Sequence, residues 1–156
     1  MIVGLLLCVL SIVPPVPGRV VQRFVAPACE RCPGHRGITI ESATGDSVVA
    51  VVSGVVVFAG WVGGSLYVVQ EIRPGVKITY GKMHKISPSL VDVNSDVAST
   101  HVLLPTGAEL GVAGPSTYLG VRVRGHYVEP MRYLGMAGAR LRGAGGLIVG
   151  GRGQPR

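Results

Sequence analysis

Four histidines and a Cys-x-x-Cys motif are the side chains of this 156-residue chain best suited to bind a metal or move a proton. His35 stands in the run His35-Arg36-Gly37-Ile38-Thr39, whereas His84, His101 and His126 are scattered along the chain. A zinc ion that activates water needs three protein ligands and an open coordination position. One imidazole cannot hold the ion, so a zinc site would have to be assembled from several strands.

The Cys-x-x-Cys motif is Cys29-Glu30-Arg31-Cys32, and a motif of this kind can be half a zinc site, a redox pair or a small local disulfide. The sequence has no second cysteine pair for a structural zinc site, because the third cysteine is Cys8. A redox motif would open a helix, but here Pro33-Gly34 and an expected strand follow. If the chain is exported, we expect Cys29 and Cys32 to form a disulfide that stiffens the loop before His35.

The elements around His35 are predicted to be short strands. Ile38 and Ile40 alternate with Thr39 and Glu41, and this period of two places the isoleucines on one face and His35, Thr39 and Glu41 on the other. Turn residues then separate β-branched runs. We therefore expect a three-stranded β-meander between residues 33 and 60, with strands at 38–41, 47–52 and 55–59.

The remaining sequence also favours strands and turns. Hydrophobic residues make up 47% of the chain, aromatic residues only 5%, and glycine (24) and proline (11) are abundant. We expect one all-β domain with short turns and little helix. Its further elements are an edge strand at 19–24, a hairpin with strands 65–72 and 76–82, a polar loop at 87–105, a strand through 116–124, and a strand end with a helical turn at 126–134.

In this order, these segments resemble the LytM/lysostaphin-type zinc metalloendopeptidases, which cut peptidoglycan cross-bridges. The matching motifs include His35 to Thr39 (His-x-Gly-x-Asp in the family), Gly45 to Ala50, Ser53 to Gly60 and the closing run 126–134. The resemblance covers residues 24–134 and implies an antiparallel β-sheet or sandwich domain.

The resemblance also implies a degenerate site. The family's three zinc-ligand positions are His35, Thr39 and Gly120 here, and its two catalytic histidines fall on Lys82 and Tyr118. A hydroxyl is a poor substitute for a carboxylate at zinc, and glycine offers no ligand atom. We therefore expect no bound cofactor and no catalytic residue.

Other residues are expected to complete the old cleft. His84 could substitute for the histidine missing at Lys82, or it could simply be an exposed histidine. Glu41, Tyr80 and Arg122 should line the cleft, with Arg122 at the position of a family glutamate. His35 should form a hydrogen bond to Tyr118 or Tyr80.

Both ends of the chain differ in composition from its middle. Residues 2–13 are a continuous apolar run followed by prolines, too short to span a bilayer comfortably but typical of a signal peptide. A buried N-terminal strand or a misplaced start codon would give the same pattern. We expect a signal-like segment at 1–18 that could act as a membrane tether, a folded domain at 19–134, and a flexible Gly/Arg-rich tail at 135–156.

These features favour an exported protein of the cell envelope or the extracellular space that binds peptidoglycan or a cell-wall hydrolase without cutting. The alternative is an active zinc metalloendopeptidase that cleaves cross-bridges with a relocated metal site. The net charge of +7 suits an anionic partner. Nucleic acid is not expected to be that partner, because no basic patch is interleaved with aromatic residues that could stack on bases.

Overall fold

The protein is described by a computed structural model that covers residues 12–90 and 101–136. Strands dominate it, and the only α-helix in these ranges is one turn long. The elements are β1 (Val20–Gln22), β2 (Ile38–Glu41), β3 (Ser47–Val49), β4 (Gly54–Val62), β5 (Ser65–Arg73), β6 (Val76–Ile86), η1 (Pro88–Leu90), β7 (Val102–Leu104), β8 (Glu109–Val123), β9 (His126–Val128) and α1 (Pro130–Tyr133). This confirms the all-β prediction.

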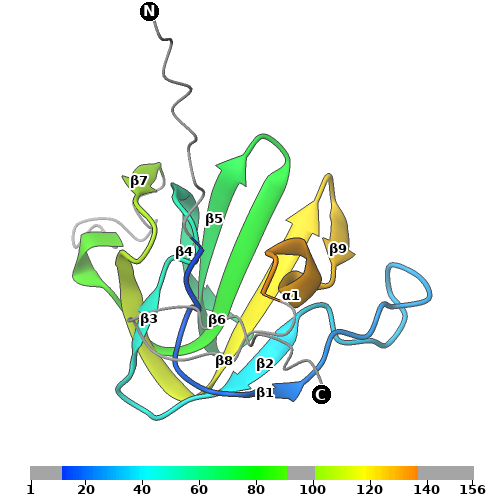
Figure 1. Ribbon diagram of the computed structural model, residues 1–156, viewed down its shortest axis with the longest axis horizontal. Helices are drawn as coiled ribbons and strands as arrows, with labels where there is room; N and C mark the ends of the chain where they lie inside the picture. The colour runs from blue at the N-terminus through cyan, green and yellow to red at the C-terminus, as the bar shows by residue number, and fades with distance from the viewer. Residues whose placement is uncertain (1–11, 91–100, 137–156) are drawn as a thin grey trace, which may run out of the picture.

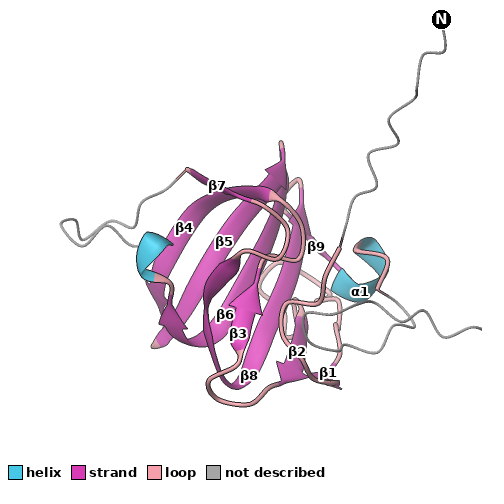
Figure 2. Cartoon of the chain, turned by 60° about the vertical axis from the view of Figure 1, so that its left-hand side comes forward, coloured by secondary structure: helices cyan, strands magenta, loops and turns pink. Residues whose placement is uncertain are grey.

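The strands form one antiparallel sheet with the order β1-β2-β8-β6-β5-β4-β7. β8 is its centre, because this long strand pairs with β2, β3, β6 and β9. The sheet is strongly curved, as Figure 2 shows. The predicted hairpin is present as β5 and β6, and β1 is the predicted edge strand.

The predicted β-meander is wrong in its pairing. β2 and β3 each pair with β8, and β4 pairs with β5 and β7, so the three strands are not neighbours of one another. The second strand also ends at Val49, and residues 50–52 turn into the core, where the Ala50 N–H donates to the Ala108 carbonyl. Alternation and turn residues indicate where strands lie, but they do not specify which strands pair.

The predicted loop at 87–105 is only partly correct. It begins with the 3₁₀ turn η1, whose Leu90 is fully buried, and it ends with β7, which extends the sheet beside β4. Residues 91–100 lie outside the described part of the chain. The strand expected at 116–124 is likewise the second half of β8, which already begins at Glu109.

The hydrophobic core extends beyond the predicted domain boundaries. Val16 is 1% exposed and Met136 is fully buried, although residues 19 and 134 were the expected limits. The segment before β1 crosses one face of the sheet, and the Val49 N–H donates to the Pro15 carbonyl there. The remainder of the signal-like segment (1–11) and of the tail (137–156) lies outside the described residues. Among the described residues, no helix has the length and apolar character needed to cross a membrane.

Candidate functional site

The candidate site is the outer face of the sheet, which is the face opposite the isoleucines of β2. Thr39 on β2 lies opposite Tyr118 on β8, and Tyr118 lies opposite Gly81 on β6. Residues directly opposite each other in antiparallel strands share a face. Tyr67 on β5 continues this row, because its ring lies against the α-carbon of Gly81. The sheet therefore brings together residues that are up to 79 positions apart in the sequence.

His35 reaches this row from the loop before β2. Its Nδ1 lies 3.0 Å from the Arg23 carbonyl oxygen, which can only accept, so Nδ1 carries the hydrogen. Nε2 then faces the Thr39 hydroxyl at 3.3 Å. The Tyr118 ring packs edge-on against the imidazole, with 5.9 Å between ring centroids. His35 thus contacts Tyr118 through its ring, and its hydrogen-bond partners are Arg23 and Thr39 instead of the expected tyrosines.

The Tyr118 side chain fills the space beside two glycines. A Cβ added at Gly120 would lie 2.6 Å from the Tyr118 hydroxyl oxygen, and a Cβ added at Gly37 would lie 2.6 Å from Cζ of the same ring. No real Cβ approaches so closely, so both positions exclude a larger side chain while the ring keeps this place. The ring of Tyr118 therefore occupies the space into which a side chain at position 120 would project.

Burial also affects the acid–base behaviour of Tyr118. It raises the pKa of the phenol to about 12, and the neighbouring Tyr127 and Tyr67 contribute in the same direction. The Arg36 guanidinium opposes this shift. A phenol that is protonated at neutral pH donates a hydrogen bond and is a weak metal ligand.

The residues at the three ligand positions do not fit zinc. His35 offers one nitrogen, Thr39 a neutral hydroxyl and Gly120 no side chain at all. Across residues 12–90 and 101–136, no three histidine, cysteine, aspartate or glutamate side chains are grouped closely enough to hold a metal ion. The site can offer aromatic surface and hydrogen bonds to a ligand, and it lacks the ligand set through which zinc would act.

Lys82 and His84 lie beyond the group formed by His35, Thr39 and Tyr118. Lys82 has a φ of 58° at a point where the pairing of β6 with β8 shifts register, and its side chain is exposed. His84 is also exposed. In the part of the chain that the structure describes, neither side chain forms a hydrogen bond or ion pair with the other residues of the site.

Two of the expected cleft-lining residues lie elsewhere. Tyr80 is fully buried in the core, where its hydroxyl donates to Gln70 Oε1 and accepts from the Val51 N–H, both at 3.0 Å. Alternation along β6 places it on the face opposite Gly81. Glu41 lies at the far end of β2 and forms an exposed ion pair with Arg19, with 2.6 Å between Oε2 and Nε.

Arg122 lies on the outer face, two residues beyond Gly120 on β8. It faces Tyr127 of β9 in the register, and its guanidinium carbon lies 5.9 Å from the centre of that ring. Arg36 approaches the same ring at 5.8 Å. This arrangement places positive charge beside the ligand positions, where a bound cation would be repelled.

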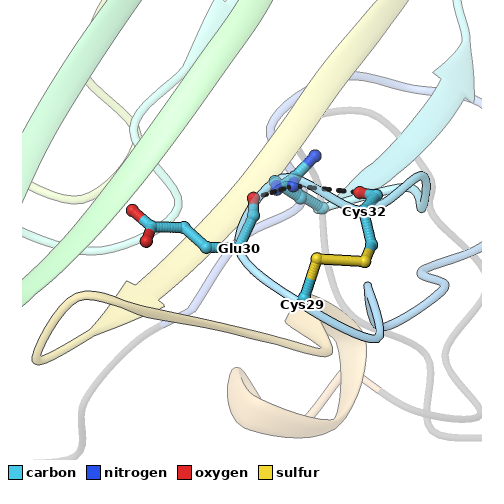
Figure 3. Close-up of a disulfide and its surroundings, with 4 residues drawn as sticks. Cys29, Glu30 and Cys32 are labelled. Atoms are coloured by element: carbon cyan, nitrogen blue, oxygen red, sulfur yellow. Dashed lines mark hydrogen bonds between the residues drawn. A yellow bond between two sulfur atoms is a disulfide. The ribbon is translucent and has the colours of Figure 1, made fainter.

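A disulfide joins Cys29 to Cys32 in the loop before β2, as Figure 3 shows. The backbone carbonyls of Glu30 and Cys32 accept hydrogen bonds from Arg36 Nη2 at 2.6 and 3.2 Å. The loop is therefore bonded to the arginine that stacks on Tyr127. The disulfide is one of the possibilities that the sequence left open for this motif.

Sequence reasoning missed Tyr67, Tyr127, Arg36 and the role of glycines 37 and 81. A usable signal was the scarcity of aromatic residues, because each tyrosine in a chain with only five has to be accounted for. The contacts themselves depend on strand register and on the shape of the loop. Neither can be read from local patterns.

Comparisons with known proteins agree with this geometry. The sequence model of Peptidase family M23 matches residues 33–130. The murein hydrolase activator EnvC of Escherichia coli (strain K12) is 33% identical over 101 residues, which are 64% of this chain and 23% of that protein. The chain thus spans less than a quarter of the length of this curated relative.

Solved structures share the fold. Helicobacter pylori Csd3 superposes with a TM-score of 0.65 at 18% identity, over 90% of this chain and 37% of that one. A zinc containing peptidase from Vibrio cholerae gives a TM-score of 0.58 at 22% identity, over 78% and 38% of the two chains. The LytM-type resemblance is confirmed: the chain belongs to Peptidase family M23.

Proposed function

We propose that this protein is a non-cutting M23 domain that acts in the cell wall, where its outer sheet face binds peptidoglycan or a cell-wall hydrolase. The observation that carries the proposal is the Tyr118 ring, which lies beside His35 and fills the space at Gly120. Zinc-dependent cutting is usual in the family, and these residues do not provide its ligand set. What they retain is a sheet face with half-buried aromatic rings that is suited to binding.

The chemistry of this face supports recognition of a sugar or peptide surface. Tyr67 and Tyr118 are half-buried, and their rings are 6.4 Å apart between centroids. Aromatic rings that are half-buried offer apolar area together with a hydroxyl for hydrogen bonding. Such surfaces suit ligands with alternating apolar and polar groups.

The cell-wall assignment is supported by the relatives. The curated relative is named as a murein hydrolase activator, and it shares this part of the chain. Regulation of a hydrolase through the outer face is therefore the partner role that we propose, beside direct binding of the wall polymer. A location in the cell envelope follows from this role, and export through the segment at 1–18 remains our prediction.

The test measures binding, cutting and activation with one preparation. The full chain is incubated with purified insoluble peptidoglycan in the presence of zinc, and pelleted protein and released fragments are measured. A peptidoglycan hydrolase is then added, and its rate is compared with and without the chain. We expect no release of fragments by the chain alone, together with either retention in the pellet or faster hydrolysis by the added enzyme.

Tyr67→Ala and Trp61→Ala form a matched pair of variants for this test. Tyr67 lies in the outer-face row, whereas Trp61 is 70% exposed at the β4–β5 hairpin and pairs in register with Leu66, on the opposite face. Loss of binding or activation in the first variant and not in the second supports the outer face. Release of fragments that requires zinc would overturn the proposal and favour a peptidase with a relocated site.

A further inference from the structure

A hollow of about 710 Å³ lies next to the outer face, between the disulfide loop and the turn that joins β8 to β9. Pro27 and Ala26 supply apolar wall, and the charged walls come from Arg36, Arg122 and Arg124. The loop projects from the right-hand side of the molecule in Figure 1, beyond β2. The hollow is thus separate from the row formed by Thr39, Tyr118 and Gly81, although Arg122 borders both.

The charge of this hollow is not balanced. Three arginines face one carboxylate, that of Glu30. Figure 3 shows this carboxylate pointing away from the disulfide and from the Glu30 backbone carbonyl. None of the three arginines forms an ion pair within the described ranges, where the ion pairs are Arg19 with Glu41 and Lys77 with Glu71. An anion that entered would therefore meet cations that lack a counter-charge.

Two of these cations are held by the same aromatic ring. Arg36 and Arg122 lie 5.8 and 5.9 Å from the centre of Tyr127, within the range of a cation–π interaction. Arg36 is also fixed by the two loop carbonyls that accept from its Nη2, which leaves its other N–H groups free to bind. The side chains are therefore ordered before any ligand arrives, which lowers the entropy lost on binding.

We propose that this hollow binds the carboxylate of a peptide that ends in a small aliphatic residue. Planar guanidinium groups pair with carboxylates through two parallel hydrogen bonds, and the apolar wall at Pro27 suits a methyl side chain beside the carboxylate. The choice of a peptide carboxylate over other anions rests on the proposed function, in which the ligand is peptidoglycan. The guanidinium chemistry on its own would also accept phosphate.

The test titrates the isotopically labelled full chain with acetyl-D-Ala-D-Ala, with its C-terminal amide and with inorganic phosphate, by nuclear magnetic resonance. We expect the free acid to shift the amide signals of residues 122–127 and of the disulfide loop. The amide should bind at least about tenfold more weakly, as expected for the loss of one charge-assisted interaction. Phosphate that bound as tightly as the free acid at the same residues would overturn the assignment to a peptide carboxylate.

Arg122→Gln and Arg19→Gln are matched variants, because each removes one positive charge. Arg19 pairs with Glu41 at the other end of β2, away from the hollow. We expect the first variant to weaken binding about tenfold and the second by less than about twofold. If both variants bound the free acid equally weakly, only the net charge would matter, and that result would refute the proposed carboxylate site.

The titration and the peptidoglycan experiment together distinguish failure of the carboxylate site from failure of the proposed function. A chain that is retained by peptidoglycan but does not bind the free acid would refute the carboxylate pocket and leave the wall-binding role intact. Binding of the free acid without retention or activation would refute the role and support the pocket.

Discussion

The two faces of β6 and β8 are built from alternate residues of the same strands, yet their side chains are packed in different ways. On the inner face, Ile78, Tyr80, Leu119 and Val121 are fully buried, and every buried polar side-chain atom in the described residues has a hydrogen-bond partner. On the outer face, aromatic rings lie over glycines, as Tyr67 lies over Gly81. The inner face is closely packed. On the outer face, the aromatic rings have room only because the residues that they cover are glycines.

This difference explains how the fold can persist without the ligand set. Inner-face residues are constrained by shape, because interiors are close-packed and a change of one methylene is costly. Thr39 and Gly120 project from the outer face, so these small residues can stand at the ligand positions without disturbing the packing of the inner face.

Rebuilding the ligand set should change zinc binding by orders of magnitude. Thr39→Asp with Gly120→His adds two ligands near His35 Nε2, which faces position 39 at 3.3 Å. Because the Tyr118 ring occupies the space at Gly120, we expect zinc binding only when Tyr118→Ala is added. Equilibrium dialysis measures the stoichiometry. Equally tight binding by the double and triple variants would show that the ring does not block the site.

Removing the Tyr80 hydroxyl should cause the largest loss of stability. Tyr80→Phe leaves the Val51 N–H and Gln70 Oε1 buried without this partner, and we expect the free energy of unfolding to fall by about 2–4 kcal/mol. Tyr67→Phe removes a hydroxyl from the outer face and should change the free energy of unfolding by less than about 0.5 kcal/mol. Urea denaturation measures both. Equal losses would contradict the contrast between the faces.

The two glycines beside Tyr118, Gly37 and Gly120, should differ in how much stability is lost when each is replaced by alanine. A Cβ at Gly37 also collides with the Leu119 carbonyl, which is backbone, whereas the three atoms nearest to a Cβ at Gly120 all belong to the Tyr118 side chain. Gly37→Ala should therefore cost about 1–3 kcal/mol, and Gly120→Ala less. In a Tyr118→Ala background, we expect Gly120→Ala to become neutral while Gly37→Ala stays destabilising. If both alanine substitutions became neutral in this background, the clash with the Tyr118 ring alone would explain their cost, contrary to this prediction.

Alkaline pH should destabilise the protein through its buried phenols. The folded-state pKa of Tyr118 is raised to about 12, so the folded state keeps a proton that the unfolded chain releases near pH 10. The stability contribution is therefore complete below pH 10 and is lost as the pH rises toward 12. Burial raises the pKa of Tyr80 in the same direction. Tyr118→Phe should make the decline between pH 10 and 12 shallower in thermal melts, and an unchanged slope would argue against burial of this phenol.

The smallest effect should come from the ion pair between Arg19 and Glu41. Its hydrogen bond and charge interaction lower the pKa of Glu41, so its contribution is present at neutral pH and is lost as the pH falls through the folded-state pKa. Both side chains are exposed, and exposed pairs add little. Arg19→Gln should leave the melting temperature at pH 7 almost unchanged. A marked decrease would show that this edge of the sheet is more important than its exposure indicates.

Much of the fold could be predicted from the sequence, because alternation and turn residues are local signals. The hairpin around Arg73-Pro74-Gly75 and the helical turn after Glu129 were both placed correctly. The pairing of β2 and β3 with β8 was not, since β8 lies some 70 residues away and nothing local encodes the register. The core residues Val16 and Met136 were missed because the sequences around them resemble a signal segment and a tail.

The candidate site was predicted less completely. The resemblance identified His35, Thr39, Tyr118 and Gly120 as neighbours of the old cleft, and the register brings Thr39 opposite Tyr118. It also assigned Tyr80 to the cleft, although a strand period of two places Tyr80 and Gly81 on opposite faces. The scarcity of tyrosines could single out Tyr67 and Tyr127 as residues to explain, but their ring contacts depend on three-dimensional packing and could not be predicted from the sequence.

Zinc stoichiometry of the unaltered full chain tests the central claim most directly. The purified protein is dialysed to equilibrium against micromolar zinc at neutral pH, and bound metal per chain is measured by elemental analysis. Because no three potential ligand side chains are grouped together among the described residues and Tyr118 fills the space at Gly120, we predict no retained zinc. One tightly held zinc ion per chain would contradict the account and indicate a working metal centre.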